Sequence, residues 1–253
     1  MQVKRSEKFS SMPGSARSYW QLSRTHRYSL LFALPLLIAY EALEAVAPVR
    51  VAGGNVRNGA DVLLNGVFIA LFGPRGPLLF MALVIGFSLW LVWRDRSAGR
   101  LEPSTFGAML GESLILSLSF GVVVGTVTMR LVGPLRALAA GGPLAGSELS
   151  RLTLSLGAGL YEELLFRVVI VALLANSLRL LGIGRLTSGV VATVVGALLF
   201  SAFHYIGPFG EPLRLESFVF RALAGLAFSA LYLKRGFGIT AWTHALYDVA
   251  VLL

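Results

Sequence analysis

Long apolar runs fill this chain and limit what it can fold into. Of its 253 residues, 56% are hydrophobic and only 14% are charged, whereas an ordinary soluble domain has about 25% charged residues. Several apolar runs reach the roughly 17 residues that a helix needs to cross a bilayer. The sequence therefore predicts an all-α, polytopic transmembrane helix bundle with about seven to eight membrane helices.

The apolar runs begin only after a basic N-terminal stretch. Residues 1–27 contain six basic residues and few apolar ones, which predicts a disordered cytoplasmic tail before a helical bundle over 28–253. The predicted membrane segments are 28–48, 60–73, 77–93, 108–130, 151–175, 187–206, 217–233 and 238–253. The segment 60–73 is short for a span, so it either crosses the membrane or stays re-entrant or interfacial.

Charge bias predicts the orientation in the membrane. The net charge is +9, and the basic residues lie mostly at the ends of apolar runs, where they suit anionic membrane lipid. If 60–73 does not cross, 13 of the 22 basic residues share the side of the N-terminal tail, which the positive-inside rule makes cytoplasmic. If 60–73 crosses the membrane, the later clusters of basic residues lie on the outer side. We favour the first interpretation. Nucleic acid is not an expected partner, because no basic face with interleaved aromatic residues lies outside the apolar runs.

Ionisable groups within the apolar runs are the strongest functional signal. Three motifs occur in order on separate predicted helices: Glu162-Glu163-x-x-x-Arg167, Phe200-x-x-x-His204 and His244-x-x-x-Asp248. A charge at bilayer depth costs a few kcal/mol or more, so such residues usually face a cavity and have a function. Cysteine is absent, which excludes disulfides, a thiolate metal site and a cysteine nucleophile.

The spacing of the first motif separates its two carboxylates. Glu163 and Arg167 are four residues apart, and on one helix face they are expected to form an ion pair. Glu162 lies about 100° further round the helix. It is left free to face a cavity, where it is expected to act as a general base.

The other two motifs place an imidazole beside a second group. Phe200 is expected to pack near the imidazole of His204, four residues on. His244 and Asp248 have the same spacing. They either share a metal ion, or the carboxylate orients the imidazole.

The ordered motifs resemble those of the CPBP family, which includes the CaaX-type prenyl endopeptidases and the Abi-like intramembrane proteases of bacteria. The resemblance covers about residues 105–253. It implies an endopeptidase of the bacterial inner membrane that hydrolyses a peptide bond of a membrane-associated or lipidated protein or peptide. By resemblance, Glu162 and His204 would activate water, and His244 and Asp248 would polarise the scissile carbonyl. Arg167 would hold the second Glu of the motif.

The resemblance also implies a metalloprotease. Glu162, His204 and His244 match the ligand count of a catalytic zinc site, so one divalent ion, with zinc preferred, is an expected cofactor. The alternative is a metal-free mechanism in which Glu162 acts directly on water. Eukaryotic CaaX proteases usually carry Asn where this chain has Asp248. Because an ionised Asp only accepts hydrogen bonds, Asp248 favours metal ligation or orientation of His244 over oxyanion donation.

Two other functions fit some of the same residues. A proton-coupled transporter also carries Glu, His and Asp in membrane helices, although the sequence shows no inverted repeat and no broken helices in matched positions. A non-proteolytic immunity or scaffold protein is expected to lose Glu162 or a motif histidine, and all of these are present.

Straight helices would not bring the motifs to one depth. With 1.5 Å rise per residue, Glu162 lies about 16 Å below the outer interface but His204 only about 3 Å. Residues 207–212 contain two glycines and two prolines, which cannot continue a helix well. We therefore expect an irregular connection that dips inward, lines a water-filled cavity and carries His204 to the depth of Glu162.

Overall fold

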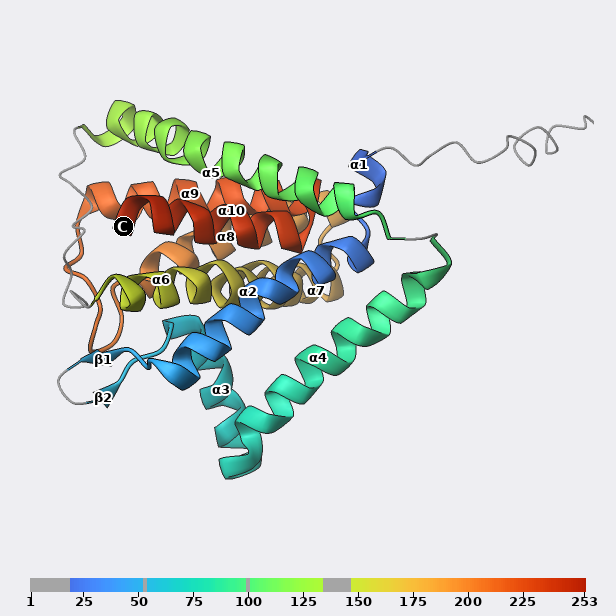
Figure 1. Ribbon diagram of the computed structural model, residues 1–253. Coiled ribbons are helices and arrows are strands. Elements are labelled where there is room, and N and C mark those ends of the chain that lie inside the picture. The colour runs from blue at the N-terminus through green and yellow to red at the C-terminus, as the bar shows by residue number, and fades with distance from the viewer. Residues whose placement is uncertain (1–18, 52–53, 99–100, 134–146) are drawn as a thin grey trace, which may run out of the picture.

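The computed structural model describes residues 19–51, 54–98, 101–133 and 147–253, which form a bundle of helices (Figure 1). The α-helices are α1 (Tyr19–Leu22), α2 (His26–Val46), α3 (Gly59–Phe72), α4 (Gly76–Arg94), α5 (Pro103–Val132), α6 (Glu148–Gly157), α7 (Val171–Leu180), α8 (Arg185–Phe203), α9 (Leu215–Arg235) and α10 (Phe237–Leu252). An antiparallel pair of short strands, β1 (Arg50–Val51) and β2 (Gly54–Asn55), joins α2 to α3.

Five segments of the described chain are long and apolar enough to cross a membrane. They are His26–Val46, Gly59–Arg94, Pro103–Val132, Arg185–Phe203 and Leu215–Arg235. The predicted all-α polytopic bundle is confirmed.

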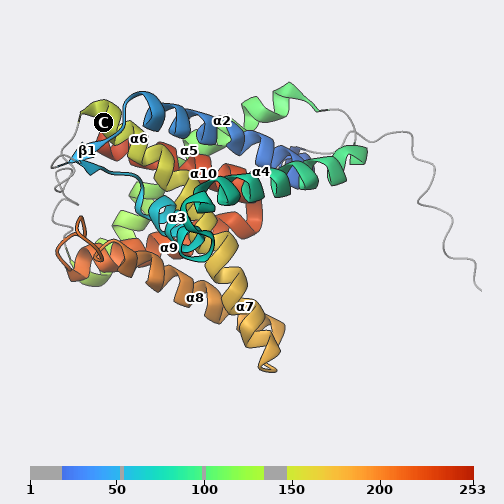
Figure 2. The ribbon, with the colours of Figure 1, turned by 90° about the horizontal axis from the view of Figure 1, so that it is seen from below.

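Helix α10 lies at the centre of the bundle. It packs against α2, α5, α6 and α9 (Figures 1 and 2). A glycine on the acidic-motif helix makes one of these contacts possible: a Cβ at Gly159 would lie 2.5 Å from the carbonyl oxygen of Ala241 and 2.6 Å from the Cβ of Ala245. Small residues at such crossings let membrane helices approach closely, and here they place the acidic motif directly beside α10.

The acidic motif lies on a widened helix. The chain is helical without a break from Glu148 to Leu180, passing through two π-helical segments, η3 (Ala158–Glu162) and η4 (Leu164–Ile170). Turns of this kind are rare and frequently lie at functional sites. The regular α-helix assumed for this motif is therefore wrong, although the four-residue spacing still brings the second Glu and the Arg together.

The segment 60–73 forms a helix of its own. At the short 3-10 turn η1 (Gly73–Arg75) the chain reverses from α3 into α4, and a Cβ at Gly76 would collide with the backbone of Phe68. Figure 1 shows α3 lying across the direction of the bundle helices, while α4 runs back obliquely. This course favours the re-entrant alternative for 60–73.

The N-terminal tail expected over 1–27 lies partly outside the described residues, which begin at residue 19. From there the structure differs from the expectation. The Tyr19 hydroxyl donates to Glu112 on α5, and Arg235 at the end of α9 donates to the same carboxylate at 2.6 Å. The guanidinium also lies 4.2 Å from the ring centre of Trp20. These contacts tie α1 to the bundle.

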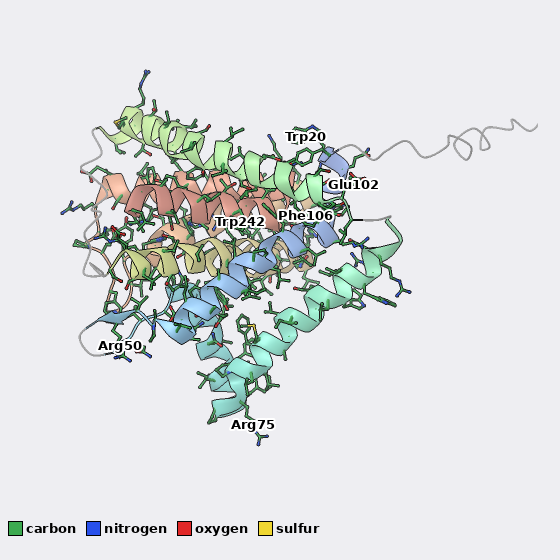
Figure 3. The ribbon with its side chains drawn as sticks, viewed as in Figure 1. Trp20, Arg50, Arg75, Glu102, Phe106 and Trp242 are labelled. Atoms are coloured by element: carbon green, nitrogen blue, oxygen red, sulfur yellow. The ribbon has the colours of Figure 1, made fainter. Side chains whose placement is uncertain are left out.

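Basic residues gather at one end of the molecule, which we call the basic end. Here α2, α5, α8 and α10 begin and α4, α7 and α9 finish (Figure 1). Its eight basic side chains among the described residues are Arg24, Arg27, Arg94, Arg96, Arg179, Arg185, Lys234 and Arg235. The opposite end has six, namely Arg50, Arg57, Arg130, Arg151, Arg214 and Arg221. Figure 3 shows Trp20 and Glu102 at the basic end and Arg50 at the other.

Candidate active site

Glu162 and His204 face each other in the wall of one cavity. Glu162 Oε2 lies 3.9 Å from His204 Nε2. This distance is too long for a direct hydrogen bond, but it allows one water molecule to contact both atoms. Glu162 is only 7% exposed, and its Oε2 has no hydrogen-bond partner among the described residues. Because a buried polar atom without a partner is costly, this oxygen is a candidate for a catalytic role.

The backbone fixes the imidazole of His204. This residue caps the end of α8, and its Nδ1 lies 2.8 Å from the carbonyl oxygen of Phe200. Since a carbonyl only accepts, Nδ1 carries the hydrogen, and Nε2 of the neutral ring is an acceptor facing Glu162. The Phe200 ring stands edge-on to the imidazole, with 5.0 Å between ring centres.

The connection after His204 is irregular, as its prolines and glycines predict. Residues 206–211 are not helical and line the cavity. The Glu211 N–H donates to the His204 carbonyl at 3.0 Å, and the Glu211 carboxylate accepts from Arg221 on α9 at 2.6 Å. The loop is thereby folded back over the end of α8.

Glu163 contacts two of the other motif residues. Its Oε2 lies 3.1 Å from Arg167 Nε, so the expected ion pair is present. Its Oε1 lies 2.7 Å from His244 Nδ1, a contact that the motif spacing did not predict. Asp248, the partner expected to orient His244, is more distant, with Oδ2 3.7 Å from Nε2. Glu163 rather than Asp248 therefore makes the hydrogen bond that orients the imidazole.

Aromatic rings enclose these buried charges. The Arg167 guanidinium lies 4.5 Å from the ring centre of Phe200 and 5.5 Å from that of Phe228. The Phe228 ring also stacks on His244, with 4.4 Å between ring centres. Cation–π contacts of this kind partly replace the water that a buried guanidinium lacks.

One cavity of about 700 Å³ connects the motif residues. Glu162, His204, His244 and Asp248 all contribute to its wall. The remaining wall is largely apolar, with Leu154, Phe203, Phe209, Phe220, Val251 and Leu252 among its residues. The volume lies in the range of small-molecule and cofactor pockets, about 300–1,000 Å³. The cavity lies toward the end of the bundle opposite the basic end, where α6 and α9 begin and α8 and α10 finish.

Sequence reasoning missed the contribution of the segment before α3. Residues 55–59 line the same cavity, and Asn58 Nδ2 donates to Glu162 Oε1 at 2.9 Å. The only signal was an Asn at the start of an apolar run, which predicts a helix cap.

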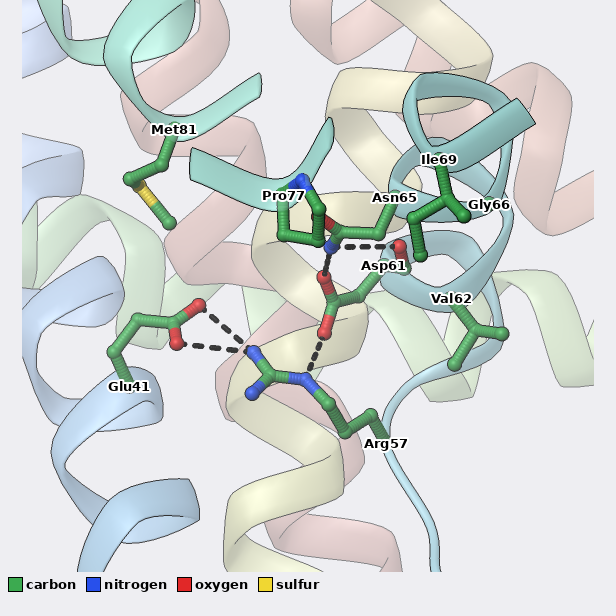
Figure 4. A pocket seen from close by; sticks show the side chains of 9 residues that line it. All are labelled: Glu41, Arg57, Asp61, Val62, Asn65, Gly66, Ile69, Pro77 and Met81. Carbon is green, nitrogen blue, oxygen red and sulfur yellow. Dashed lines mark hydrogen bonds and ion pairs between the residues drawn. The ribbon is translucent and has the colours of Figure 1, made fainter. Parts of the chain in front are cut away.

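Arg57 borders both this cavity and a second one of about 460 Å³. There it lies between Glu41 and Asp61 (Figure 4). Burial lowers the pKa of Arg57, but its hydrogen bonds to Asp61 and Glu41 and the charges around it outweigh burial and raise the pKa above its ordinary value. The guanidinium is therefore a permanent cation beside the site.

The expected zinc ligands do not form one ligand set. In the part of the chain that the structure describes, no three His, Asp or Glu side chains are grouped closely enough to hold a metal ion. Instead Glu162 pairs with His204, and His244 pairs with Glu163. In this arrangement the residues do not fit a resident metal, and zinc binding stays a prediction.

These features define the chain as a helical membrane protein with an internal polar site. Residues 147–250 match the family model described as Type II CAAX prenyl endopeptidase Rce1-like. The matched segment holds all three motifs and extends from α6 into α10. The C-terminal part of this chain is therefore similar to Rce1-like domains, and the resemblance to CPBP intramembrane proteases is confirmed. Comparisons with curated proteins and with solved structures found no match.

Proposed function

We propose that this protein is an intramembrane endopeptidase that hydrolyses a peptide bond of a membrane-associated or lipidated protein or peptide. The observation that carries the proposal is the pair of Glu162 Oε2 and His204 Nε2, 3.9 Å apart on a cavity within an apolar bundle. The Rce1-like family match supports this class of reaction.

Glu162 and His204 act on one water molecule. Both atoms accept hydrogen bonds, so a water between them donates one hydrogen to each and turns a lone pair toward the scissile carbonyl. The water oxygen bonds to the carbonyl carbon while Glu162 takes its proton, which produces a tetrahedral oxyanion. When the intermediate collapses, the C–N bond breaks and Glu162 returns the proton to the leaving amine. His204 orients the water throughout.

His244 stabilises the oxyanion. Its Nδ1 is held by Glu163 at 2.7 Å, and its Nε2 lies 3.7 Å from Asp248 in the wall of the same cavity. With a carboxylate facing each ring nitrogen, both nitrogens are placed to act as donors. A donor aimed at the developing negative charge is typically worth about 10²–10³ in kcat.

We further propose a bacterial inner membrane as the location, with the basic end in the cytoplasm. The eight basic side chains at that end, against six at the other, support this orientation. The cavity then lies toward the extracytoplasmic side, from which the substrate enters. Its apolar wall suits an apolar or lipidated segment. In this orientation a membrane-anchored protein is the favoured substrate, whereas the prenylated C-terminus that the family description suggests would require the opposite orientation.

The test compares wild type with Glu162→Ala. Cells producing either protein are analysed for new protein termini by mass spectrometry. Both purified proteins are also incubated in liposomes with a fluorescence-quenched farnesylated CAAX peptide and with the same peptide lacking the farnesyl group. We expect cleavage products only with wild type. Identical termini and uncut peptides with both proteins would refute the peptidase and favour the non-proteolytic scaffold. Cleavage of the farnesylated peptide alone would show that the enzyme requires a prenyl group, and cleavage of both peptides would show that it does not.

A further inference from the structure

The side chain that donates a hydrogen bond to Glu162, the proposed general base, belongs to Asn58 and lies outside the Rce1-like segment. Asn58 directly precedes α3, whereas the family match begins at residue 147. Its side chain is 7% exposed, and its Nδ2 donates to Glu162 Oε1 at 2.9 Å. We propose that Asn58 is a positioning residue for Glu162, so that the N-terminal part of the chain completes the active site. This inference rests on the proposed peptidase function.

The amide of Asn58 has only one possible orientation. Its Oδ1 caps α3 by accepting from the Ala60 N–H at 2.9 Å. Only the oxygen of an amide can accept, so the NH₂ group must point the other way, toward Glu162. The backbone is held as well, because the Asn58 N–H donates to the Tyr40 hydroxyl at 3.3 Å. Turning the amide away from Glu162 would also break the helix cap.

This hydrogen bond selects which oxygen of Glu162 meets the water. Asn58 occupies Oε1, and Oε2 is left without a protein hydrogen bond among the described residues, 3.9 Å from His204 Nε2. A carboxylate held at one oxygen cannot rotate freely. The catalytic oxygen is therefore preorganised by a residue about a hundred positions earlier in the chain.

The packing leaves room for this contact. A Cβ at Gly157 would lie 2.9 Å from the Cβ of Asn58 and 2.6 Å from Cε2 of Tyr40. The glycine thus lets the segment before α3 lie against the helix that carries Glu162. No larger side chain at this position would permit the approach without a shift.

The residues that adjoin Asn58 and Glu162 in the sequence, Arg57 and Tyr161, are also connected, because both bind Glu41. Arg57 binds both oxygens of Glu41, at 2.9 and 3.0 Å, and also binds Asp61 (Figure 4). Glu41 in turn accepts from the hydroxyl of Tyr161, the residue next to Glu162, at 2.6 Å. The Asn58–Glu162 contact therefore lies within a polar network between α2, α3 and η3, and the network limits its movement.

The test separates the hydrogen bond to Glu162 from the helix cap. Asn58→Ala removes both, whereas Asn58→Ser keeps a good capping residue but is too short to reach Glu162. We expect both variants to lower kcat by about 10–100-fold with little change in KM, the usual cost of losing a group that orients an active-site ligand. Asn58→Ser should regain the yield and Tm that Asn58→Ala loses. Thr25→Ala, which removes the cap of α2 away from the site, is the control and should keep the wild-type kcat.

A wild-type kcat in Asn58→Ser would overturn the proposal and would show that Asn58 serves only as the N-cap of α3. A second measurement does not depend on activity: the orientation of the Glu162 carboxylate in experimental structures of wild type and Asn58→Ser. The variant carboxylate should lose its fixed orientation toward His204 Nε2, and an unchanged orientation would count against the proposal. If wild type shows no Glu162-dependent cleavage, the peptidase fails and the two structures alone decide the role of Asn58.

Discussion

Glu163 Oε1 lies 2.7 Å from His244 Nδ1, and this contact joins the first motif to the third across the centre of the bundle. The other oxygen of the same carboxylate lies 3.1 Å from Arg167 Nε. All three side chains are buried. In an apolar interior each of these groups is stable only while its partners remain.

Arg167→Ala should therefore destabilise the protein. It leaves the buried Glu163 carboxylate without its guanidinium partner and with His244 alone, at a cost of about 3–5 kcal/mol, so we expect less protein in the membrane and a lower Tm in detergent. Glu162→Ala is the matched comparison and should insert and purify like wild type, since it removes a buried charge and does not leave an oppositely charged partner behind. Equal abundance and Tm for the two variants would contradict this division of roles.

Replacing both partners of the ion pair should separate stability from activity. The double variant Glu163→Met with Arg167→Met removes both charges of the ion pair and leaves Asp248 as the carboxylate beside His244, and replacing both partners of a buried pair is often neutral or stabilising. We expect it to recover most of the Tm lost in Arg167→Ala. It should remain inactive, because His244 has lost the acceptor that orients it. Recovery of activity together with Tm would show that Glu163 has no orienting role.

The sequence predicted the contacts that lie within one helix and the order of the motifs. The apolar runs indicated the bundle, and the four-residue spacing indicated the Glu163–Arg167 pair. The prolines and glycines after His204 indicated the irregular loop that lines the cavity. Each of these follows from local rules of helix geometry and chain breaking.

The contacts that the sequence did not predict join residues that are far apart in the chain. Asn58 meets Glu162 and Glu163 meets His244 only because glycines let the helices approach closely. The π-helical turns at Glu162 also have no local signature, since their residues would serve equally well in an α-helix. Packing decides these features, and a single sequence does not contain the packing.

Gly159→Ala should destabilise the protein, although it adds only one methyl group. The added methyl would meet Ala241 and Ala245 on α10 at 2.5–2.6 Å, and overpacking of this kind typically costs about 1–3 kcal/mol. We expect a lower Tm and reduced activity, because α10 carries His244. Gly111→Ala is the control, since nothing lies within 4 Å of the corresponding Cβ. There the better helix propensity of Ala should leave Tm unchanged or raise it. A Gly159→Ala variant with wild-type Tm would show that α10 can shift at no cost.

Metal removal should leave cleavage intact. The geometry gives Glu162 and His204 access to water without a metal, and the described residues hold no group of three ligands. We expect wild type dialysed against EDTA or 1,10-phenanthroline to keep its Glu162-dependent activity, with the metal content measured by mass spectrometry. A loss that zinc restores would instead show that Glu162, His204 and His244 gather around an ion when it is present.

The orientation of the cavity can be tested directly, because the chain contains no cysteine. Leu213, in the loop at the cavity end, is 72% exposed, and Leu181, in the turn between α7 and α8 at the basic end, is 78% exposed. A single cysteine at either position is therefore a matched probe. If the basic end is cytoplasmic, a membrane-impermeant maleimide should label Leu213→Cys in intact bacterial cells and label Leu181→Cys only after lysis. The reverse pattern would place the cavity toward the cytoplasm, where a prenylated protein tail would reach it, and would show that the charge bias does not orient this protein.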